Sequence, residues 1–407
     1  MKSPIYLDHN ATTPLLPEAA EAMLRCQAEC YGNPASQHSA GRRARNALEE
    51  AREGIGRILG AEIDQFDADR VIFTSGGTEA NHLAQLGLAG DEPAHAVISA
   101  IEHPSVIGPA EYLQRERGWQ IDRLGVSPAG QVEAARLPEL LRPDTRFVSI
   151  MLGNNETGAV QPVAELATTC AAAGVPLHVD AAQAAGKISV DFHALGAALM
   201  TVAAHKFHGP VGIGALIVRR GLELRPQMFG GFQQAGLRPG TEAVALAVGM
   251  HAALAAWQRE QQEITQRLTE LRDQFERGLL AECPELSVNG LAADSLAGQR
   301  LPHVSNVTFP GVEGQVLMMA LDLAGVCCST GSACASGSSQ PSPTLLAMGL
   351  KKELAESSLR FSFGRTSTTG EAAEACGRII KIYKELRDKN SARKSTVSPR
   401  NAGPNSL

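Results

Sequence analysis

The sequence predicts an α/β fold in which a mostly parallel β-sheet is covered by helices on both faces. The first observation is that short apolar runs rich in β-branched residues recur along the chain. The second is that stretches with helical periodicity separate these runs, so strands and helices alternate. The third is size: 407 residues, 44% of them hydrophobic and 20% charged, allow two or three domains with a large core.

The predicted elements follow in chain order. Each predicted strand is a short apolar run of the length expected for a strand buried on both faces. These runs are residues 71–74, 96–99, 147–151, 177–179, 198–202 and 214–218. The predicted helices are residues 43–59, 79–87 and 163–173. A longer helix, about residues 243–280, is rich in Gln, Glu and Arg and is expected to be a solvated connector between domains.

The last part of the chain differs in composition. A smaller α+β segment is expected over about residues 283–386. Residues 388–407 contain Lys, Ser, Pro, Asn and Gly with almost no apolar residues, which predicts a disordered tail.

Composition disfavours several classes of protein. The formal net charge of −6 argues against a nucleic-acid-binding surface over the whole protein, and 4% aromatic residues are few for base stacking. Residues 1–14 contain no apolar signal-peptide core, and residues 243–257, the most apolar stretch, are too short for a membrane span. The eight cysteines include no CxxC pair, which disfavours a disulfide scaffold or structural zinc. We therefore expect a cytoplasmic protein without nucleic-acid or membrane partners.

A lysine and an aspartate follow two of the predicted strands. Asp180 ends the stretch that begins at Leu177, and His205-Lys206 comes just after the next run. Residues at the C-terminal ends of strands gather at the ligand-binding edge of an open α/β sheet. The pair suits pyridoxal phosphate (PLP), because a lysine amine forms a Schiff base with its aldehyde and a carboxylate keeps its ring nitrogen protonated. Either residue alone is more often a helix cap or a solvated charge.

Three polar turns at strand ends support this interpretation. Residues 74–79 (Thr-Ser-Gly-Gly-Thr-Glu) open a helix whose N-terminal N–H groups suit a phosphate, although ordinary glycine-rich turns look similar. Glu102-His103 follows another strand, where the histidine could stack on a flat ring and shuttle protons or simply cap a helix. Residues 154–158 (Asn-Asn-Glu-Thr-Gly) follow a third strand. The absence of Walker A and GxGxxG motifs disfavours a nucleotide site.

The same region has an alternative interpretation as a metal site. His178 and Asp180 would share one strand face, and His205 and His208 lie three residues apart. Lys206, between the two histidines, adds positive charge where a cation would bind, so we expect no metal.

A second chemical centre is the Ser/Gly-rich run at residues 327–339, which contains three of the eight cysteines. Such a run cannot form a core, so a mobile loop is expected. Cys334 on this loop is placed for reactivity, whereas Cys327 is expected to end a buried strand, and both interpretations stay open for Cys328. Arg360 lies in a strand-like alternation, where it could grip a carboxylate with two hydrogen bonds or be an exposed charge.

Taken together, these motifs resemble those of the cysteine desulfurases, PLP enzymes of the class-V aminotransferase group. They occur in the family's order from residue 5 to about residue 366. The run around Cys334 resembles the first of the family's two groups, which supplies iron–sulfur cluster assembly. The matching stretches are residues 6–14, 32–36, 74–79, 102–103, 154–158, 178–183, 205–206, 238–241, 331–334 and 360–362.

The resemblance implies the PLP-dependent transferase fold of type I aminotransferases. It places a large PLP-binding domain with a mostly parallel seven-stranded sheet at residues 16–258. A smaller α+β domain with the cysteine loop would comprise residues 1–15 and 259–387. The resemblance also implies a homodimer, L-cysteine as substrate, L-alanine as product, and sulfur transfer through a Cys334 persulfide to an acceptor protein such as an iron–sulfur scaffold.

The resemblance further implies a role for each matching residue. Lys206 would carry PLP and move the proton at Cα, and Asp180 would pair with the ring nitrogen. Gln183 would hydrogen-bond the ring's phenolate oxygen, His103 would stack on the ring and assist proton transfer, and Cys334 would be the nucleophile. The phosphate would be held by Gly77, Thr78 and His205, with Thr241 reaching the phosphate of the other subunit. The substrate carboxylate would be bound by Asn155, which also contacts the cofactor, and by Arg360 and Asn33.

The chain departs from the family's pattern just before the lysine. Ala203-Ala204 stand where Ser-Gly is common, so one hydroxyl bond to the phosphate is missing, worth about 1.5–3 kcal/mol. Val211 stands where Lys is common.

The rival functions are another PLP reaction, such as transamination or selenocysteine cleavage, and a non-catalytic role on a decayed enzyme scaffold. The presence of both Lys206 and Cys334 disfavours the decayed scaffold. A serine hydrolase is disfavoured because no GxSxG motif occurs.

Overall fold

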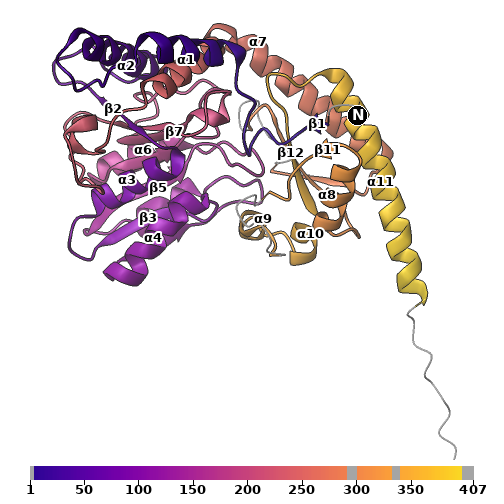
Figure 1. Ribbon diagram of the computed structural model, residues 1–407. Coiled ribbons are helices and arrows are strands. Elements are labelled where there is room, and N and C mark those ends of the chain that lie inside the picture. Colours follow the sequence, from indigo (N-terminus) through magenta and orange to yellow (C-terminus); the bar gives the residue numbers. More distant parts are fainter. Residues whose placement is uncertain (1–3, 291–299, 332–339, 397–407) are drawn as a thin grey trace, which may run out of the picture.

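The computed structural model describes residues 4–290, 300–331 and 340–396 (Figure 1). A seven-stranded sheet and its helices form one side of the molecule, and a smaller group of strands and helices forms the other. The first strand, β1 (Ile5–Tyr6), belongs to the smaller group because it pairs in parallel with β11 (Val326–Cys327). The long helix α7 (Val244–Glu282) runs between the two groups.

The seven-stranded sheet confirms the predicted fold class. The strand order is β2-β8-β7-β6-β5-β3-β4, and all neighbouring pairs are parallel except the two that involve β8. Buried strands such as β3, β7 and β8 appear in the sequence as the predicted apolar runs. The bounds are β2 (Arg70–Thr74), β3 (His95–Ser99), β4 (Gln120–Leu124), β5 (Thr145–Met151), β6 (Leu177–Asp180), β7 (Leu199–Ala203) and β8 (Gly214–Val218).

The sequence analysis misses strand β4. This strand lies at the edge of the sheet and pairs only with β3. Gln120 and Arg123 are exposed and Asp122 is half-buried, so the strand contains no apolar run that would reveal it.

Helices cover both faces of the sheet, as predicted. Successive residues of β2 enter different cores: Val71 and Phe73 join the core of helix α2 (Ser39–Ile58), whereas Ile72 packs in the core of helix α3 (Gly77–Ala89). The other helices of this group are α1 (Pro17–Glu29), α4 (Pro104–Arg117), α5 (Leu137–Leu140) and α6 (Val163–Ala172). Short 3₁₀ helices are η1 (Ala134–Arg136), η2 (Ala204–Lys206) and η3 (Gln233–Gly236).

Helix α7 is only partly the solvated connector that its composition predicts. An apolar stripe along it is buried in the large core because its apolar residues recur every three or four positions. The ring of Phe275 in this stripe lies 5.1 Å from that of Phe361 and 5.4 Å from that of Phe363, centroid to centroid. The helix therefore supports the smaller group of strands rather than merely linking two domains.

The smaller group matches the predicted α+β segment. Its antiparallel sheet has the order β12-β10-β9. The strands are β9 (Ser287–Asn289), β10 (Val304–Thr308) and β12 (Ser358–Ser362), and the helices are α8 (Gly314–Leu323), α9 (Pro343–Ala347), α10 (Lys352–Glu356) and α11 (Thr369–Thr396). The domain boundaries at residues 16, 258 and 387 stay predictions.

Helix α11 continues to Thr396, so the predicted disorder is wrong for residues 388–396. A low apolar content suggested disorder, but Lys, Arg and Ala favour a helix, and no Gly or Pro interrupts these residues. The Asn390 side chain also donates a hydrogen bond to the Gly311 carbonyl at 3.0 Å. Residues 397–407 lie outside the described residues.

Candidate active site

Lys206 lies directly beyond β7, in η2, at the C-terminal edge of the large sheet. Its Nζ donates hydrogen bonds to the backbone carbonyls of Asn10 at 2.7 Å and Ala11 at 2.9 Å. These two residues follow β1, so the N-terminal segment reaches across to the sheet edge. The lysine is thus held by a segment 196 residues earlier in the chain.

Asp180 ends β6, the strand next to β7, so Asp180 and Lys206 follow neighbouring strands as predicted. The Asp180 carboxylate is 6% exposed and accepts hydrogen bonds from Asn81 Nδ2 at 2.8 Å and the Ala182 N–H at 2.9 Å. Asn81 is a fully buried residue of α3. It orients the carboxylate from the helix that begins at the glycine-rich turn.

The glycine-rich turn lies against the end of β7. A Cβ placed on Gly77 would lie 3.4 Å from Ala203 Cβ. Gly77 and Thr78 form the first turn of α3, a 13-residue helix whose N-terminal N–H groups suit an anion. His205, between Ala204 and Lys206, places its Nδ1 3.2 Å from Thr12 Oγ1. These three predicted phosphate ligands therefore lie at the same edge as the lysine.

His103 is both a helix cap and a pocket residue, the two interpretations that the sequence offers. It is the N-cap of α4, where its Nδ1 accepts a hydrogen bond from the Ser105 N–H at 3.1 Å. Its side chain also lines the pocket that contains Lys206. Burial lowers the pKa of His103, with Asp180 opposing this shift and Lys206 adding to it. A neutral imidazole is suited to accept or pass on a proton.

Arg360 is a buried arginine of β12, not an exposed strand charge. Its Nη1 donates to the carbonyls of Asn155 at 3.0 Å and Gly331 at 3.2 Å, and its Nη2 donates to Asp8 Oδ1 at 2.7 Å. The residue is 2% exposed, and its Nε has no partner among the described atoms. A buried guanidinium with an unsatisfied N–H is suited to bind a carboxylate.

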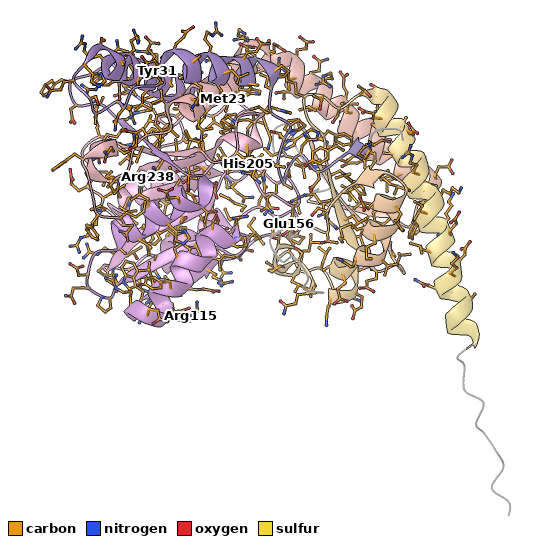
Figure 2. The ribbon with its side chains drawn as sticks, in the orientation of Figure 1. Met23, Tyr31, Arg115, Glu156, His205 and Arg238 are labelled. Atoms are coloured by element: carbon orange, nitrogen blue, oxygen red, sulfur yellow. The ribbon has the colours of Figure 1, made fainter. Side chains whose placement is uncertain are left out.

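One pocket of about 320 Å³ brings five of the predicted site residues together. Of the predicted site residues, it is lined by His103, Asn155, Gln183, Lys206 and Arg360. Asn33 and Thr241 instead line a separate groove of about 740 Å³ beside α1. Figure 2 shows Met23 and Tyr31 of that groove near α1 and α2, away from Glu156 of the pocket.

Cys334 lies outside the described residues. The residues on either side of it in the chain that the structure describes, Gly331 and Gln340, both line the pocket. Cys327 is half-buried at the end of β11 rather than buried as predicted, because that strand is a two-residue edge pair with β1. Burial raises the pKa of the Cys328 thiol well above its usual range, so Cys328 is an unreactive thiol.

The metal interpretation is not supported by the described part of the chain. His178 Nδ1 lies 2.8 Å from Ser149 Oγ and its Nε2 lies 3.0 Å from Thr201 Oγ1, so both ring nitrogens are engaged in the core. Residues 4–290, 300–331 and 340–396 contain no group of three His, Cys, Asp or Glu side chains arranged so that it could hold a metal ion.

Comparison with known proteins identifies the family. The family model described as "Aminotransferase class-V" matches residues 5–374. The chain belongs to the class-V aminotransferase family. The cysteine desulfurase IscS of Dictyoglomus turgidum is 40% identical over 98% of this chain and 97% of its own, and an IscS-like cysteine desulfurase of Mycobacterium tuberculosis is 42% identical over 91% and 94%. The resemblance stated from the motifs is thereby confirmed.

Solved structures agree with the class-V assignment. A NifS-like protein has a TM-score of 0.85 at 30% identity, covering 94% of this chain and 100% of its own. A NifS-like protein of Rickettsia africae has a TM-score of 0.83 at 30% identity, covering 95% of this chain and 99% of its own. The seven-stranded sheet and its helices therefore form a type I PLP-dependent transferase fold.

Class-V aminotransferases are PLP-dependent enzymes, and the pocket fits that cofactor. Lys206 Nζ donates hydrogen bonds to two backbone carbonyls and lines the pocket, so its amine is placed to condense with an aldehyde there. The N-terminus of α3 offers N–H groups for a phosphate, and the buried Asp180 carboxylate suits a protonated ring nitrogen. The unpartnered Nε of Arg360 is left for a substrate carboxylate.

Glu102 is a second buried carboxyl group of this class-V site. Its Oε1 accepts hydrogen bonds from the Ser99 hydroxyl and, at 2.9 Å, from the Met151 N–H. Its Oε2 has no partner among the described atoms. Burial raises the pKa of Glu102 to about 8, against the lowering effect of the Ser99 and Met151 hydrogen bonds. Glu102 is therefore a neutral acid at pH 7.

We expect Glu102→Gln to abolish a pH-dependent loss of stability. With a pKa of about 8 in the fold and 4.5 ordinarily, Glu102 contributes stability below pH 4.5 that is lost as pH rises through 8. Relative to the variant, the free energy of unfolding of the wild type should fall by on the order of a few kcal/mol over this range. Denaturant unfolding at several pH values measures this difference. The exposed Glu139→Gln serves as control. An unchanged difference between pH 5 and pH 9 would contradict the buried neutral acid.

Several residues of the class-V site are missed by the sequence analysis. Asn10 acts through its backbone carbonyl, which no side-chain pattern reveals. Glu156 is a buried carboxyl that accepts a hydrogen bond from Ser342 Oγ at 2.6 Å, and a Cβ on Gly331 would lie 2.5 Å from its Oε2. Glu156 thus contacts both sides of the segment that contains Cys334. Its place in the Asn-Asn-Glu-Thr-Gly run was the only available signal.

Proposed function

We propose that the protein is a PLP-dependent cysteine desulfurase. It converts L-cysteine to L-alanine and passes the sulfur, as a persulfide on Cys334, to an acceptor protein for iron–sulfur cluster or thio-cofactor assembly. The observation that carries this proposal is the pocket that joins Lys206, His103 and the buried Arg360 and is bordered by both described ends of the Cys334 segment. An aminotransferase site has no need of a cysteine there.

Each residue has a proposed task toward the cofactor. Lys206 bonds PLP covalently, Asp180 hydrogen-bonds its ring nitrogen, and Gln183 donates to its ring oxygen. His103 stacks on the ring, and the phosphate is held by Gly77, Thr78 and His205. When bound, PLP supplies an electron sink for the electron pair released at the substrate Cα.

The reaction itself depends on residues of the chain. Arg360 and Asn155 bind the substrate carboxylate and so orient the Cα–H bond toward Lys206, whereas Asn33 lies in the separate groove. Lys206 Nζ removes that proton, and His103 assists its transfer. The Cys334 thiolate attacks the substrate sulfur; the C–S bond breaks, an S–S bond forms, and carbon keeps the electron pair and is protonated to give alanine.

The active enzyme is proposed to be a homodimer. Thr241 lies in the 740 Å³ groove rather than in the pocket, so it suits the phosphate of a second copy. Large apolar side chains are exposed nearby along the chain: Phe229 is 89% and Phe232 is 95% exposed. A monomer leaves such side chains in water at a cost, which a dimer interface removes.

We place the protein in the cytoplasm. The seven cysteines of the described residues are all free thiols, as a reducing compartment favours. Among these residues, no helix has the length and apolar character to span a membrane.

The first test is a visible absorption spectrum of the purified protein before and after addition of L-cysteine, with alanine and sulfide assayed under a reductant. A coloured protein that forms both products at equal rates supports the desulfurase. A Cys334→Ala variant should keep the colour and lose sulfide release. A coloured protein without sulfur release points to another PLP reaction, and a colourless protein that PLP cannot reconstitute contradicts the proposal.

Ala203→Ser is expected to strengthen PLP binding. The Ala203 side chain lies beside Gly77, so a hydroxyl at this position reaches toward the phosphate site. One hydrogen bond to a charged group is worth about 1.5–3 kcal/mol, so the Kd for PLP should fall about 10- to 100-fold. Fluorescence titration of the cofactor-free protein measures this. The control is pyridoxal, whose affinity should not change because it lacks the phosphate; an equal gain for both would exclude the phosphate as the cause.

A further inference from the structure

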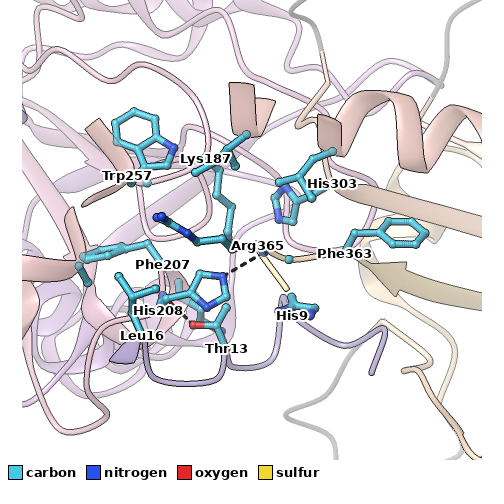
Figure 3. Close-up of a pocket in the computed structure, with 16 residues that line it drawn as sticks. His9, Thr13, Leu16, Lys187, Phe207, His208, Trp257, His303, Phe363 and Arg365 are labelled. Atoms are coloured by element: carbon cyan, nitrogen blue, oxygen red, sulfur yellow. Dashed lines mark hydrogen bonds between the residues drawn. The ribbon is translucent and has the colours of Figure 1, made fainter. Parts of the chain in front are cut away.

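A second, smaller cavity of about 20 Å³ shares Lys206 with the active-site pocket (Figure 3). Figure 3 shows Lys187 in its lining together with three histidines, one tryptophan and one arginine: His9, His208, His303, Trp257 and Arg365. None of these has a role in the proposed reaction. Lys187 is the member whose burial is hardest to explain by packing alone, since a lysine is rarely buried without a partner of opposite charge.

Lys187 is 6% exposed and forms none of the ion pairs found in the described part of the chain. Its Nζ donates one hydrogen bond, to Gln183 Oε1 at 3.0 Å. Burial lowers the pKa of Lys187 well below its usual range, and the charges of Lys206 and Arg360 lower it further. Burial and the neighbouring cations therefore favour the neutral form of this amine, whose observed side-chain hydrogen bond goes to Gln183.

The Gln183 amide is fixed at both ends. Its Nε2 donates to the Asn10 carbonyl at 3.0 Å, and its Oε1 accepts from Lys187. The Asn10 carbonyl also accepts from Lys206, and the Asn10 side chain is held by His303 Nε2 at 2.7 Å and by the Asn155 carbonyl at 2.9 Å. The amide nitrogen therefore faces the active-site pocket, and the amide oxygen faces Lys187. Its second N–H is available to a ligand in that pocket.

We propose that Lys187 is a positioning residue that acts through Gln183 on the ring oxygen of PLP. Its hydrogen bond holds the amide with the nitrogen toward the cofactor. The same bond polarises the amide and strengthens donation from Nε2, since hydrogen bonds in a chain reinforce one another. This inference rests on the proposed PLP chemistry and adds a residue behind the cofactor that controls its protonation.

The surroundings of Lys187 are cationic or neutral rather than acidic. The titratable and charged groups that face it or act on it are His9, His205, His208, His303, Lys206, Arg360 and Arg365. Burial lowers the pKa of His9 to about 3 and of His208 to about 4. These two histidines stay neutral above pH 6, so they do not contribute to a titration of the visible band above that value.

The experiment is a pH titration of the visible band of the PLP-loaded protein, with Lys187→Met and Gln183→Leu. A donor to the ring oxygen stabilises its negative charge and so favours loss of the proton that the band reports. Weaker donation should raise the titration midpoint, by about 0.5 pH unit in K187M and by about 1 unit in Q183L. Because Lys187 acts through Gln183, the double variant should match Q183L alone.

Trp257→Phe is the matched control, because Trp257 lines the same cavity and its ring N–H has no hydrogen-bond partner among the described atoms, so the midpoint should not move. Lys187→Leu repeats the test with different packing should K187M fail to fold. An unchanged midpoint in the Lys187 variants, or additive shifts in the double variant, would overturn the inference. A wild type without a visible band would refute the PLP function instead, so the two failures are distinguishable.

Discussion

Lys206→Ala is expected to lower the rate of alanine and sulfide release by about 10³-fold or more and to remove the visible band that the native lysine gives with PLP. The loss is large because one amine has two tasks: it holds the cofactor, and it moves the Cα proton. In the structure that amine is already oriented by the carbonyls of Asn10 and Ala11. Among the described residues, Lys206 is the one lysine that lines this pocket, and Lys187 lies in the cavity behind it.

Single-turnover assays and absorbance spectra of PLP-incubated protein measure this effect. Lys351→Ala, at an exposed lysine, should behave as the wild type. Residual activity within tenfold of the wild type would mean that another group abstracts the proton.

Arg360→Met should raise the KM for L-cysteine and lower kcat/KM by about 10²- to 10³-fold, while PLP still binds. The guanidinium is buried, its Nε has no partner among the described atoms, and it lies in the same pocket as Lys206, so it is the group best placed for the substrate carboxylate. Steady-state kinetics with L-cysteine measure the change, and the visible band checks the cofactor.

Asp8→Asn is the control for the structural part of this effect. It weakens the Arg360–Asp8 ion pair, which spans 2.7 Å, but leaves the guanidinium in place. Its kcat/KM should change by less than tenfold. Equal losses in both variants would show that the ion pair, not carboxylate binding, accounts for the effect of Arg360.

The sequence predicts the central strands because they are buried on both faces and so appear as apolar runs. It does not predict β4, whose Gln120 and Arg123 meet solvent at the sheet edge. The position of α7 was predicted from its length and charge, but its buried stripe depends on which elements pack against it. The helix beyond Asp388 was missed because a low apolar content indicates that a segment is not buried but says little about its helix propensity.

For the site, strand order decides what is predictable. Asp180 and Lys206 follow adjacent parallel strands, so their proximity follows from general rules of α/β sheets. The carbonyl of Asn10 and the pairing of Lys187 with Gln183 depend on contacts between distant segments, and neither has a sequence pattern. Thr241 lies apart from the pocket, in the groove beside α1, and this separation has no sequence pattern.

The parallel pairing of β1 with β11 has a consequence for biosynthesis. The Asn10 N–H donates a hydrogen bond to Ser362 Oγ across 352 residues, and Asp8 pairs with Arg360 over the same separation. The carbonyls that orient Lys206 are therefore fixed only after the ribosome has released β12. A nascent chain that has completed the large sheet does not yet hold the carbonyls of Asn10 and Ala11 against Lys206. Acquisition of the cofactor's colour thus marks the end of folding rather than its beginning, and a chain truncated before Arg360 should stay pale.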